Sequence, residues 1–271
     1  MQQLLSQINS GKWLVMGILN VTPDSFSDGG RFNQLDRALE HALQMQDEGA
    51  DIIDIGGEST RPGAVAVSVE EELQRVIPVI EKIRQHSDIA ISVDTSKPLV
   101  MRSAIDAGAN MVNDVNALQT DGAISVCVEH GVPVCLMHKQ GDPLTMQDNP
   151  QYGDIIAEIS VYLAARAEAC IEAGIASSNI IIDPGFGFGK SLQDNLTLLR
   201  QMDKLCALGY PVLVGVSRKS MFGMLLGREA EDRLVASTTA VALAYQKGAR
   251  FFRVHDVMAT CDALKICEAI A

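Results

Sequence analysis

The sequence is poor in aromatic residues and contains no long apolar run. Phe, Trp and Tyr make up 4% of the 271 residues, and no stretch reaches the roughly 18 apolar residues that a membrane span needs. The first twenty residues lack the apolar segment and cleavage-like site of a secretory signal. We therefore expect a cytoplasmic protein without a membrane segment.

Cysteine and positive charge are also limited. No pair of the six cysteines has the CxxC spacing, which argues against a disulfide framework or a zinc site and favours reduced, packed thiols. Lys and Arg total 22 against 34 acidic residues, a formal charge of −12. This balance predicts no nucleic-acid partner and no basic membrane face. An anionic ligand would have to meet cations that are concentrated locally.

What the sequence does contain is a repeat of apolar run, polar loop and helical stretch. Its period is about 34 residues, which is 271 divided by eight. The runs are rich in Val, Ile and Leu, which is typical of parallel strands buried on both faces. The expected strands are Trp13–Asn20, Asp51–Gly56, Ile89–Asp94, Met111–Val115, Val132–Met137, Ile180–Pro184, Val212–Ser217 and Phe251–Asp256.

Helix start and stop signals lie between these runs. Ser68 and Glu71 form a capping-box pattern, and Pro98 stands at a first helical turn behind Thr95 and Ser96 as cap candidates. Six of the seven helices that lead into another strand end in a glycine able to adopt the left-handed conformation. These glycines are Gly49, Gly108, Gly131, Gly174, Gly209 and Gly248.

Eight strand–helix units could form an open doubly wound sheet or a closed barrel. The count of eight, the length and the lack of GxGxxG after the first strand favour an α/β fold of the (β/α)8 TIM-barrel type, with residues 1–271 as one domain.

Polar residues gather where the expected strands end, whereas the strand starts are mostly apolar. Since the active site of such a barrel lies at the C-terminal ends of its strands, this asymmetry predicts a functional site there. The residues are Asn20, Glu58, Ser59, Thr60, Arg61, Asp94, Asn113, Asp114, His138, Asp183, Ser217, Arg218, Lys219, Ser220, Arg253, His255 and Asp256.

The segment IDPGFGFGKS (182–191) is close to a nucleotide-binding P-loop but has Pro184 where that motif needs glycine. We interpret it as a loop that lets a flat ligand approach the backbone, with Phe186 or Phe188 as a stacking wall. Asp183 can accept two N–H bonds from a guanidine-like edge of a heterocycle.

Cations recur near the last two strands. Arg218 and Lys219 begin a helix, where an anion would be favoured, although a structural ion pair is the alternative interpretation. Arg253 and His255 alternate along the last strand and so face the same side. With Arg61 they would form the cationic focus that a polyanion requires. His138 is left without a role, and no HExxH-type metal cluster occurs.

Seven ordered segments carry a family resemblance: MGILNVTPDSFSDGG (16–30), DIIDIGGESTRPGA (51–64), SVDTSKP (92–98), NDVNAL (113–118), IDPGFGFGK (182–190), GVSRKSMFG (215–223) and RVHDV (253–257). Together they resemble the dihydropteroate synthase family over essentially the whole chain. The resemblance implies an alkyl/aryl transferase of folate biosynthesis. It would join 6-hydroxymethyl-7,8-dihydropterin diphosphate to 4-aminobenzoate, giving 7,8-dihydropteroate and pyrophosphate with Mg²⁺.

The resemblance also implies site residues. The pterin would contact Asp94, Asn113, Asp183 and Lys219, and the diphosphate would contact Asn20, Thr60, Arg61, Arg253 and His255. Asn20 would be the protein ligand of Mg²⁺. The displacement would be dissociative, with Asp94, Lys219, Arg253 and His255 as the catalytic residues.

For the second substrate the resemblance implies Pro62, Phe186, Lys219 and Ser220 around 4-aminobenzoate. Phe26 and Pro62 are the residues expected in a form that sulfonamides inhibit. Family members further suggest a homodimer that associates through helices of the C-terminal half.

Three other functions compete with this interpretation. A methyltetrahydrofolate–corrinoid methyltransferase would share the pterin pocket but has no diphosphate to bind, so Arg253, His255 and Arg61 argue against it. A non-catalytic pterin or phosphate carrier would leave the catalytic positions without a role. A phosphosugar aldolase or epimerase would need a Schiff-base lysine or a metal cluster, and Lys219 alone is well placed.

Overall fold

Eight parallel strands form a nearly closed barrel in the computed structural model, which describes residues 1–271 except 10, 23–30, 60–62, 143–144 and 271. Their order is β6-β5-β4-β3-β2-β1-β8-β7, and a parallel bridge between Ile182 and Val212 joins the two ends of this sheet. The predicted fold class is thus confirmed. The strands are β1 (Leu14–Asn20), β2 (Ile52–Gly56), β3 (Ala90–Asp94), β4 (Met111–Asp114), β5 (Val134–Met137), β6 (Ile180–Asp183), β7 (Leu213–Val214) and β8 (Phe251–Val254).

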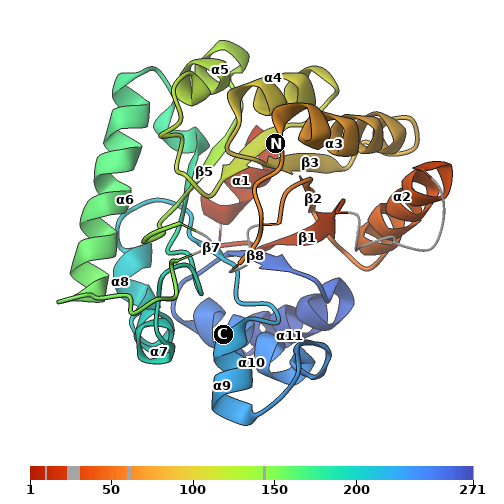
Figure 1. The fold of residues 1–271 in the computed structure, drawn as a ribbon. Coiled ribbons are helices and arrows are strands. Elements are labelled where there is room, and N and C mark those ends of the chain that lie inside the picture. The colour runs from red at the N-terminus through yellow and green to blue at the C-terminus, as the bar shows by residue number, and fades with distance from the viewer. Residues whose placement is uncertain (10, 23–30, 60–62, 143–144, 271) are drawn as a thin grey trace.

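Helices surround the strands on the outside (Figure 1). The helix α1 precedes the first strand and was not predicted. The α-helices are α1 (Gln2–Asn9), α2 (Arg31–Asp47), α3 (Val69–Arg84), α4 (Pro98–Asp106), α5 (Ala123–His130), α6 (Ile155–Glu172), α7 (Leu192–Arg200), α8 (Met202–Cys206), α9 (Ser220–Leu226), α10 (Leu234–Gln246) and α11 (Val257–Ala269), with short 3₁₀ turns at Ser177–Asn179 and Ala230–Asp232.

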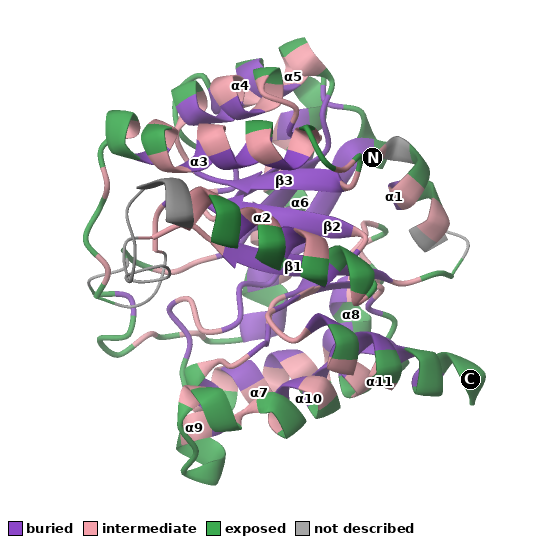
Figure 2. Ribbon diagram, turned by 90° about the vertical axis from the view of Figure 1, so that its right-hand side faces the viewer, coloured by how far each residue is buried: buried purple, intermediate pink, exposed green. Residues whose placement is uncertain are grey.

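Apolar side chains form two separate cores. One lies between the strands and the helices, and the strands β2 and β3 are accordingly buried throughout, as is β1 up to its last residue (Figure 2). The other lies inside the barrel and includes Leu5 of α1, which packs with the inward side chains near the strand starts. The inner core consists of Leu5, Leu14, Met16, Ile52, Ala90, Met111, Cys135, Ile181, Leu213 and Phe251.

The strand period places polar groups directly above this inner core. Side chains alternate between the two faces of a strand, so the residue two positions after an inner-core residue also faces inward. Asp54 follows Ile52 in this way, and Arg253 follows Phe251. The same spacing relates Asn113 to Met111 and Asp183 to Ile181, and it brings Ser92 and then Asp94 above Ala90. The barrel interior therefore changes from apolar to polar along its axis.

The helix signals are largely confirmed. All six predicted helix-end glycines have positive φ. The Ser68 side chain accepts a hydrogen bond from the Glu71 backbone N–H, while the Glu71 carboxylate pairs with Arg75. Pro98 is the first residue of α4, but its cap is Lys97 without a side-chain capping bond. Thr95 and Ser96 are thus wrong as caps.

Strands β7 and β8 end earlier than predicted, at Val214 and Val254. Beyond these ends, the Ser217 hydroxyl accepts the backbone N–H of His255 at 3.1 Å, so the two segments are joined there through a side chain. The cysteines are all thiols without a disulfide, as expected. Within the described part of the chain no helix is long and apolar enough to cross a membrane.

Candidate active site at the C-terminal ends of the strands

A buried cluster of charges fills the polar end of the barrel. Arg253 on β8 donates from Nε to Asp54 Oδ2 at 2.6 Å and from Nη2 to Asp94 Oδ2 at 2.8 Å. Asn113 Nδ2 on β4 donates to the same Asp54 oxygen at 3.2 Å. Both acids are buried, while the Arg253 side chain is 20% exposed. One guanidinium thus pairs with two carboxylates and offsets the repulsion between them.

Burial and neighbouring acids alter the protonation of this cluster. Burial raises the pKa of Asp94 to about 7; Arg253 opposes the increase, and Asp54, Asp114 and Glu72 add to it. For Arg253, burial disfavours the charge, but Asp54 and Asp94 outweigh that effect and raise its pKa. Asp94 can therefore change its charge near neutral pH while Arg253 stays a cation.

Asp183 ends β6 beside the glycine-rich loop. Its Oδ1 accepts the Gly185 backbone N–H at 2.6 Å, and its pKa is raised by burial, against this bond and the attraction of Lys219, Lys190 and Arg253. Gly185 has φ +70°, which favours glycine, and a Cβ there would lie 2.0 Å from the His138 carbonyl oxygen. The loop can follow this path only because residue 185 lacks a side chain.

Lys219 reaches the site next to Phe188. Its Nζ lies 4.2 Å from the centre of the Phe188 ring, and its stem passes close to Gly187. Phe186, by contrast, is 1% exposed and packs in the outer core. This burial argues against Phe186 as an aminobenzoate wall: its ring fills the space between strands and helices, and Phe188 is the ring beside Lys219.

Arg218 and His255 have structural partners. Arg218 forms a bidentate ion pair with Asp256, with Nε–Oδ2 3.0 Å and Nη2–Oδ1 2.5 Å, and it adopts φ 56°. The structural-pair interpretation of Arg218 is thus the better one. His255 Nδ1 lies 3.0 Å from Ser217 Oγ, so its other ring nitrogen, Nε2, is the one directed away from that contact.

Of the remaining predicted positions, the structure describes Ser220 and Asn20. Ser220 is exposed at the first residue of α9. Asn20 ends β1, is half-buried, and its amide makes no hydrogen bond to the described residues. Thr60, Arg61, Pro62 and Phe26 lie outside the described residues. Where the chain is described, no group of three His, Cys, Asp or Glu side chains could hold a metal ion.

An ion-pair cluster supports the chain on either side of residues 60–62. Lys97 Nζ donates to both Glu58 Oε2 and Glu72 Oε2 at 2.5 Å. Glu58 Oε1 in turn accepts the Val67 backbone N–H at 3.0 Å, and Arg75 donates to the Gly57 carbonyl at 2.6 Å. These bonds fix both ends of the segment that follows β2.

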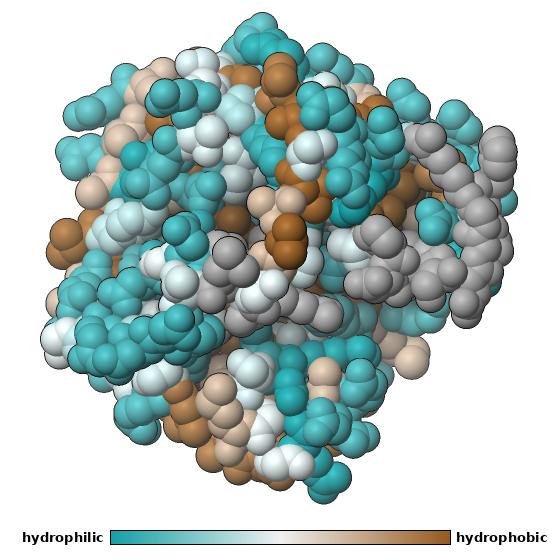
Figure 3. All heavy atoms as spheres, in the orientation of Figure 1, coloured by the Kyte–Doolittle hydropathy of each residue, from teal (hydrophilic) through white to brown (hydrophobic). Residues whose placement is uncertain are grey.

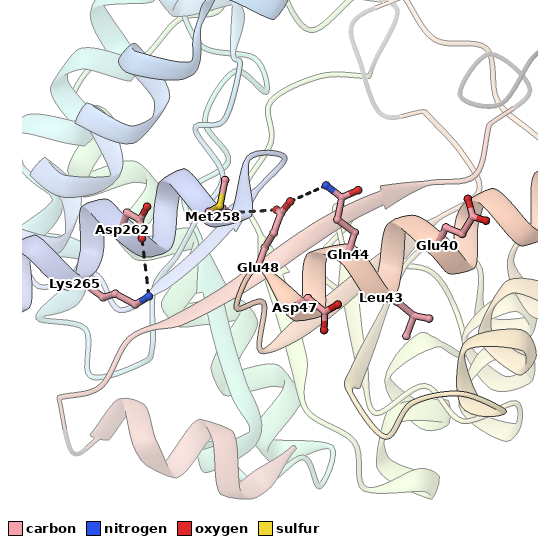
Figure 4. Close-up of a pocket in the computed structure, with 8 residues that line it drawn as sticks. All are labelled: Glu40, Leu43, Gln44, Asp47, Glu48, Met258, Asp262 and Lys265. Carbon is pink, nitrogen blue, oxygen red and sulfur yellow. Dashed lines mark hydrogen bonds and ion pairs between the residues drawn. The ribbon is translucent and has the colours of Figure 1, made fainter.

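A surface hollow of about 640 Å³ lies elsewhere, between α2 and α11 (Figure 4). Four of its eight lining residues are acidic and one is basic, with Glu48 accepting the Met258 backbone N–H at 3.4 Å and Lys265 paired to Asp262 at 4.0 Å. An acidic lining disfavours an anionic ligand, so this hollow does not compete with the strand-end cluster.

Two buried charged residues, one in the cluster and one behind the glycine-rich loop, are not indicated by the sequence motifs. Asp54 lies within the apolar strand IIDIG and was not singled out, although a signal was present. It shares the inward phase of Ile52, whereas Ile53 and Ile55 belong to the outer core. Lys190, in turn, was considered only as part of a failed P-loop pattern.

A family model described as pterin binding enzyme matches residues 16–255. The dihydropteroate synthase of Haemophilus influenzae is 51% identical over 257 residues, covering 95% of this chain and 94% of that protein. The chain belongs to the dihydropteroate synthase family.

Solved structures of family members agree with this. The Xanthomonas albilineans dihydropteroate synthase in complex with 7,8-dihydropteroate is 50% identical, with a TM-score of 0.88 and coverage of 96% of this chain and 94% of that chain. The Yersinia pestis dihydropteroate synthase in a sulfonamide drug complex is 49% identical, with a TM-score of 0.91 and the same coverage. Family membership thus extends over nearly the full length.

Proposed function

We propose that the chain condenses 6-hydroxymethyl-7,8-dihydropterin diphosphate with 4-aminobenzoate to give 7,8-dihydropteroate and pyrophosphate. Residues 1–271 would act as one domain. The observation that carries the proposal is the buried set Asp94, Asn113 and Asp183, which meets Lys219 and Arg253 at one end of a barrel of this family. The named relatives are synthases, which argues against the methyltransferase alternative.

The pterin ring matches the acids and the amide. Asp183 still has Oδ2 to accept N–H bonds from the amino-pyrimidine edge, since Oδ1 is bound to Gly185. Asn113 can donate and accept along the ring, and Lys219 can donate to its oxygen and nitrogen side. Because these groups are buried, each pairing with the ring counts for more than it would in water.

The diphosphate would lie over β1 and β8. Arg253 offers Nη1, which makes no bond to the described residues, while its Nε and Nη2 are held by Asp54 and Asp94. We place His255, Asn20, Thr60 and Arg61 in the same subsite. A guanidinium oriented beforehand stabilises charge that develops on the leaving group.

Mg²⁺ fits this subsite as a substrate-borne ion. It commonly binds substrate phosphates through one or two protein oxygens and keeps several waters. The side-chain oxygen of Asn20, which makes no hydrogen bond to the described residues, would supply one such oxygen, and no larger ligand set occurs among the described residues. When bound, the ion would neutralise charge on the diphosphate oxygens.

The displacement would be dissociative. The bond between the exocyclic methylene carbon and oxygen breaks, and pyrophosphate leaves with the electron pair. Ionised Asp94 stabilises the positive charge that spreads into the ring. The amine nitrogen then bonds to the methylene carbon and releases one proton. The described residues need supply no covalent nucleophile.

The second substrate would stack beside Phe188 and Lys219, with its carboxylate at Ser220 and with Pro62 on the loop after β2. This pocket is where sulfonamides, as mimics of 4-aminobenzoate, would compete. Inhibition relieved by added 4-aminobenzoate supports it, and insensitivity well above the competing substrate concentration contradicts it.

The protein would act in the cytoplasm as a homodimer. Exposed apolar side chains gather at the lower edge of Figure 3, where Figure 1 places α9, and continue onto α10. They include Met224, Leu225, Leu226, Leu234, Val235 and Leu243. Such a patch is typical of an interaction surface. Light scattering that gives a monomer mass at micromolar concentration would contradict the dimer.

The decisive experiment measures pyrophosphate release from the pterin diphosphate with Mg²⁺, with and without 4-aminobenzoate. Release that depends on the amine, together with dihydropteroate formation, supports the proposal. If the pterin binds but no pyrophosphate is released, the methyltransferase and carrier functions become the better explanations.

A further inference from the structure

Lys190 is a buried cation outside the substrate pocket. Its side chain is only 3% exposed, and its Nζ lies 3.0 Å from the Phe188 carbonyl oxygen, 3.3 Å from the His138 carbonyl oxygen and 3.1 Å from His138 Nδ1. An ammonium has three N–H donors, so all three are used. The lysine therefore points into the protein and cannot serve a phosphate as a P-loop lysine does.

His138 provides a neutral acceptor for this ammonium. Burial and the charge of Lys190 lower its pKa to about 3. Its ring lies edge-on to Tyr162 with centres 4.9 Å apart, and Tyr152 lies 6.1 Å away. With Nδ1 accepting from Lys190, the ring proton is on Nε2. His138 thus has a partner that the sequence did not reveal.

The glycine-rich loop lies directly against the segment that follows β5. A Cβ at Gly189 would lie 2.2 Å from the Gln140 carbonyl oxygen, and Gly185 meets His138 equally closely. Tyr152 Oη also donates to the Gly189 carbonyl at 2.8 Å. Lys190 is the cation that joins the two segments, since it bonds the loop at Phe188 and the β5 side at His138.

The same loop carries parts of the site. Phe188, whose carbonyl Lys190 holds, presents its ring to Lys219 at 4.2 Å. Gly185 at the other end of the loop donates to Asp183 Oδ1. A displacement of the loop would therefore move the Phe188 ring away from Lys219 and also disturb the hydrogen bond between Gly185 and Asp183.

We propose that Lys190 is a positioning residue: by bonding the end of β5 and the Phe188 carbonyl at once, it fixes the glycine-rich loop and thereby sets Phe188 and Lys219 for both substrates. The inference rests on the proposed function. Because Lys190 lies outside the proposed pocket, it would act through the loop and so affect the binding of both substrates.

The charge of Lys190 supplies a further readout. Burial lowers the pKa of Lys190 to about 7; among the charged groups that face it, Asp183 and Asp194 oppose the decrease and Lys219 adds to it. His138, which accepts from Lys190 through Nδ1, is already neutral. A neutral amine has two N–H groups for three acceptors, so the loop loses one bond as the pH rises through this value.

The test compares Lys190→Met with two controls in α8, Lys204→Met on the surface and Leu205→Ala in the core. We expect KM to rise about tenfold for both substrates in Lys190→Met, the size expected when hydrogen bonds to a charged donor are lost. Lys204→Met should leave KM unchanged. Leu205→Ala lowers Tm without touching the loop, so it separates stability from positioning.

A pH profile distinguishes positioning from a general structural effect. In the wild type, KM should rise as the pH passes about 7, and Lys190→Met should lack this rise. Equal KM values in Lys190→Met and Leu205→Ala, with the pH dependence intact, would overturn the proposal. A wild type without amine-dependent pyrophosphate release would instead remove the proposed function.

His138→Phe keeps the proposal testable if Lys190→Met does not fold. This variant retains an aromatic ring against Tyr162 and removes both ring nitrogens, including the Nδ1 acceptor of Lys190. A KM about threefold higher, in line with the loss of one of three hydrogen bonds, supports the inference. An unchanged KM and an unchanged pH profile would contradict it.

Discussion

The two ends of the barrel interior differ in chemistry although the same strands build both. Near the strand starts the interior is apolar and α1 contributes Leu5 to it, whereas two residues further along β2, β4, β6 and β8 the interior holds Asp54, Asn113, Asp183 and Arg253. Burying charge costs free energy unless partners compensate. The apolar end can therefore stabilise the fold. The polar end contributes less to stability, because its charges are buried, but it can recognise a ligand.

The largest effect is expected from Arg253→Met at the polar end. It removes the cation from Asp54 and Asp94 and from the leaving diphosphate, so kcat should fall by about 10²–10³-fold, the usual loss when one stabilising donor is removed. Steady-state kinetics with a circular dichroism check of folding measures it. Activity within tenfold of the wild type would contradict the role of Arg253.

At the apolar end, Ile181→Ala should give the opposite pattern. Ile181 is fully buried in the inner core, so urea unfolding should show a loss of about 2–5 kcal/mol, whereas the kcat/KM of the folded protein should stay near the wild type. A large fall in kcat/KM with unchanged stability would erase the proposed division between the two ends.

The smallest effect concerns pH at the polar end. Because the folded pKa of Asp94 is about 7, against 3.8 as its ordinary value, kcat/KM should rise as the pH increases toward 7, and Asp94→Asn should lack this limb. The linked stability has the opposite sign. Between these values the folded state binds the extra proton, so the free energy of unfolding falls as the pH rises.

Sequence periodicity was sufficient for the strands and the helix ends, because continuous apolar runs and left-handed glycines are local properties. Side-chain direction is not local. From the sequence, either Phe186 or Phe188 could stack against a ligand. The structure shows that the Phe186 side chain is buried in the core, whereas the Phe188 ring lies beside Lys219. Likewise, Arg218 is joined to Asp256 by a contact across 38 positions that spacing does not reveal.

Other differences arise where tertiary contacts replace local preferences. The helix α1 has no strong start signal and exists beside an inner core that Leu5 completes. The alternation of side chains along β2 indicates that Asp54 faces inward, since it lies two positions after Ile52. The roles of Thr60, Arg61 and Pro62 remain predictions, since these residues lie outside the described part of the chain.

Strand pairing is not equally extensive around the barrel. Between β6 and β7 the described strands share one bridge, from Ile182 to Val212, whereas β1 and β2 pair over five positions. Asp183 stands on one side of that seam and Lys219 follows the other. A pterin bound to both side chains would connect the two sides of this seam. The substrate itself would then cross-link the barrel where its strand pairing is sparse.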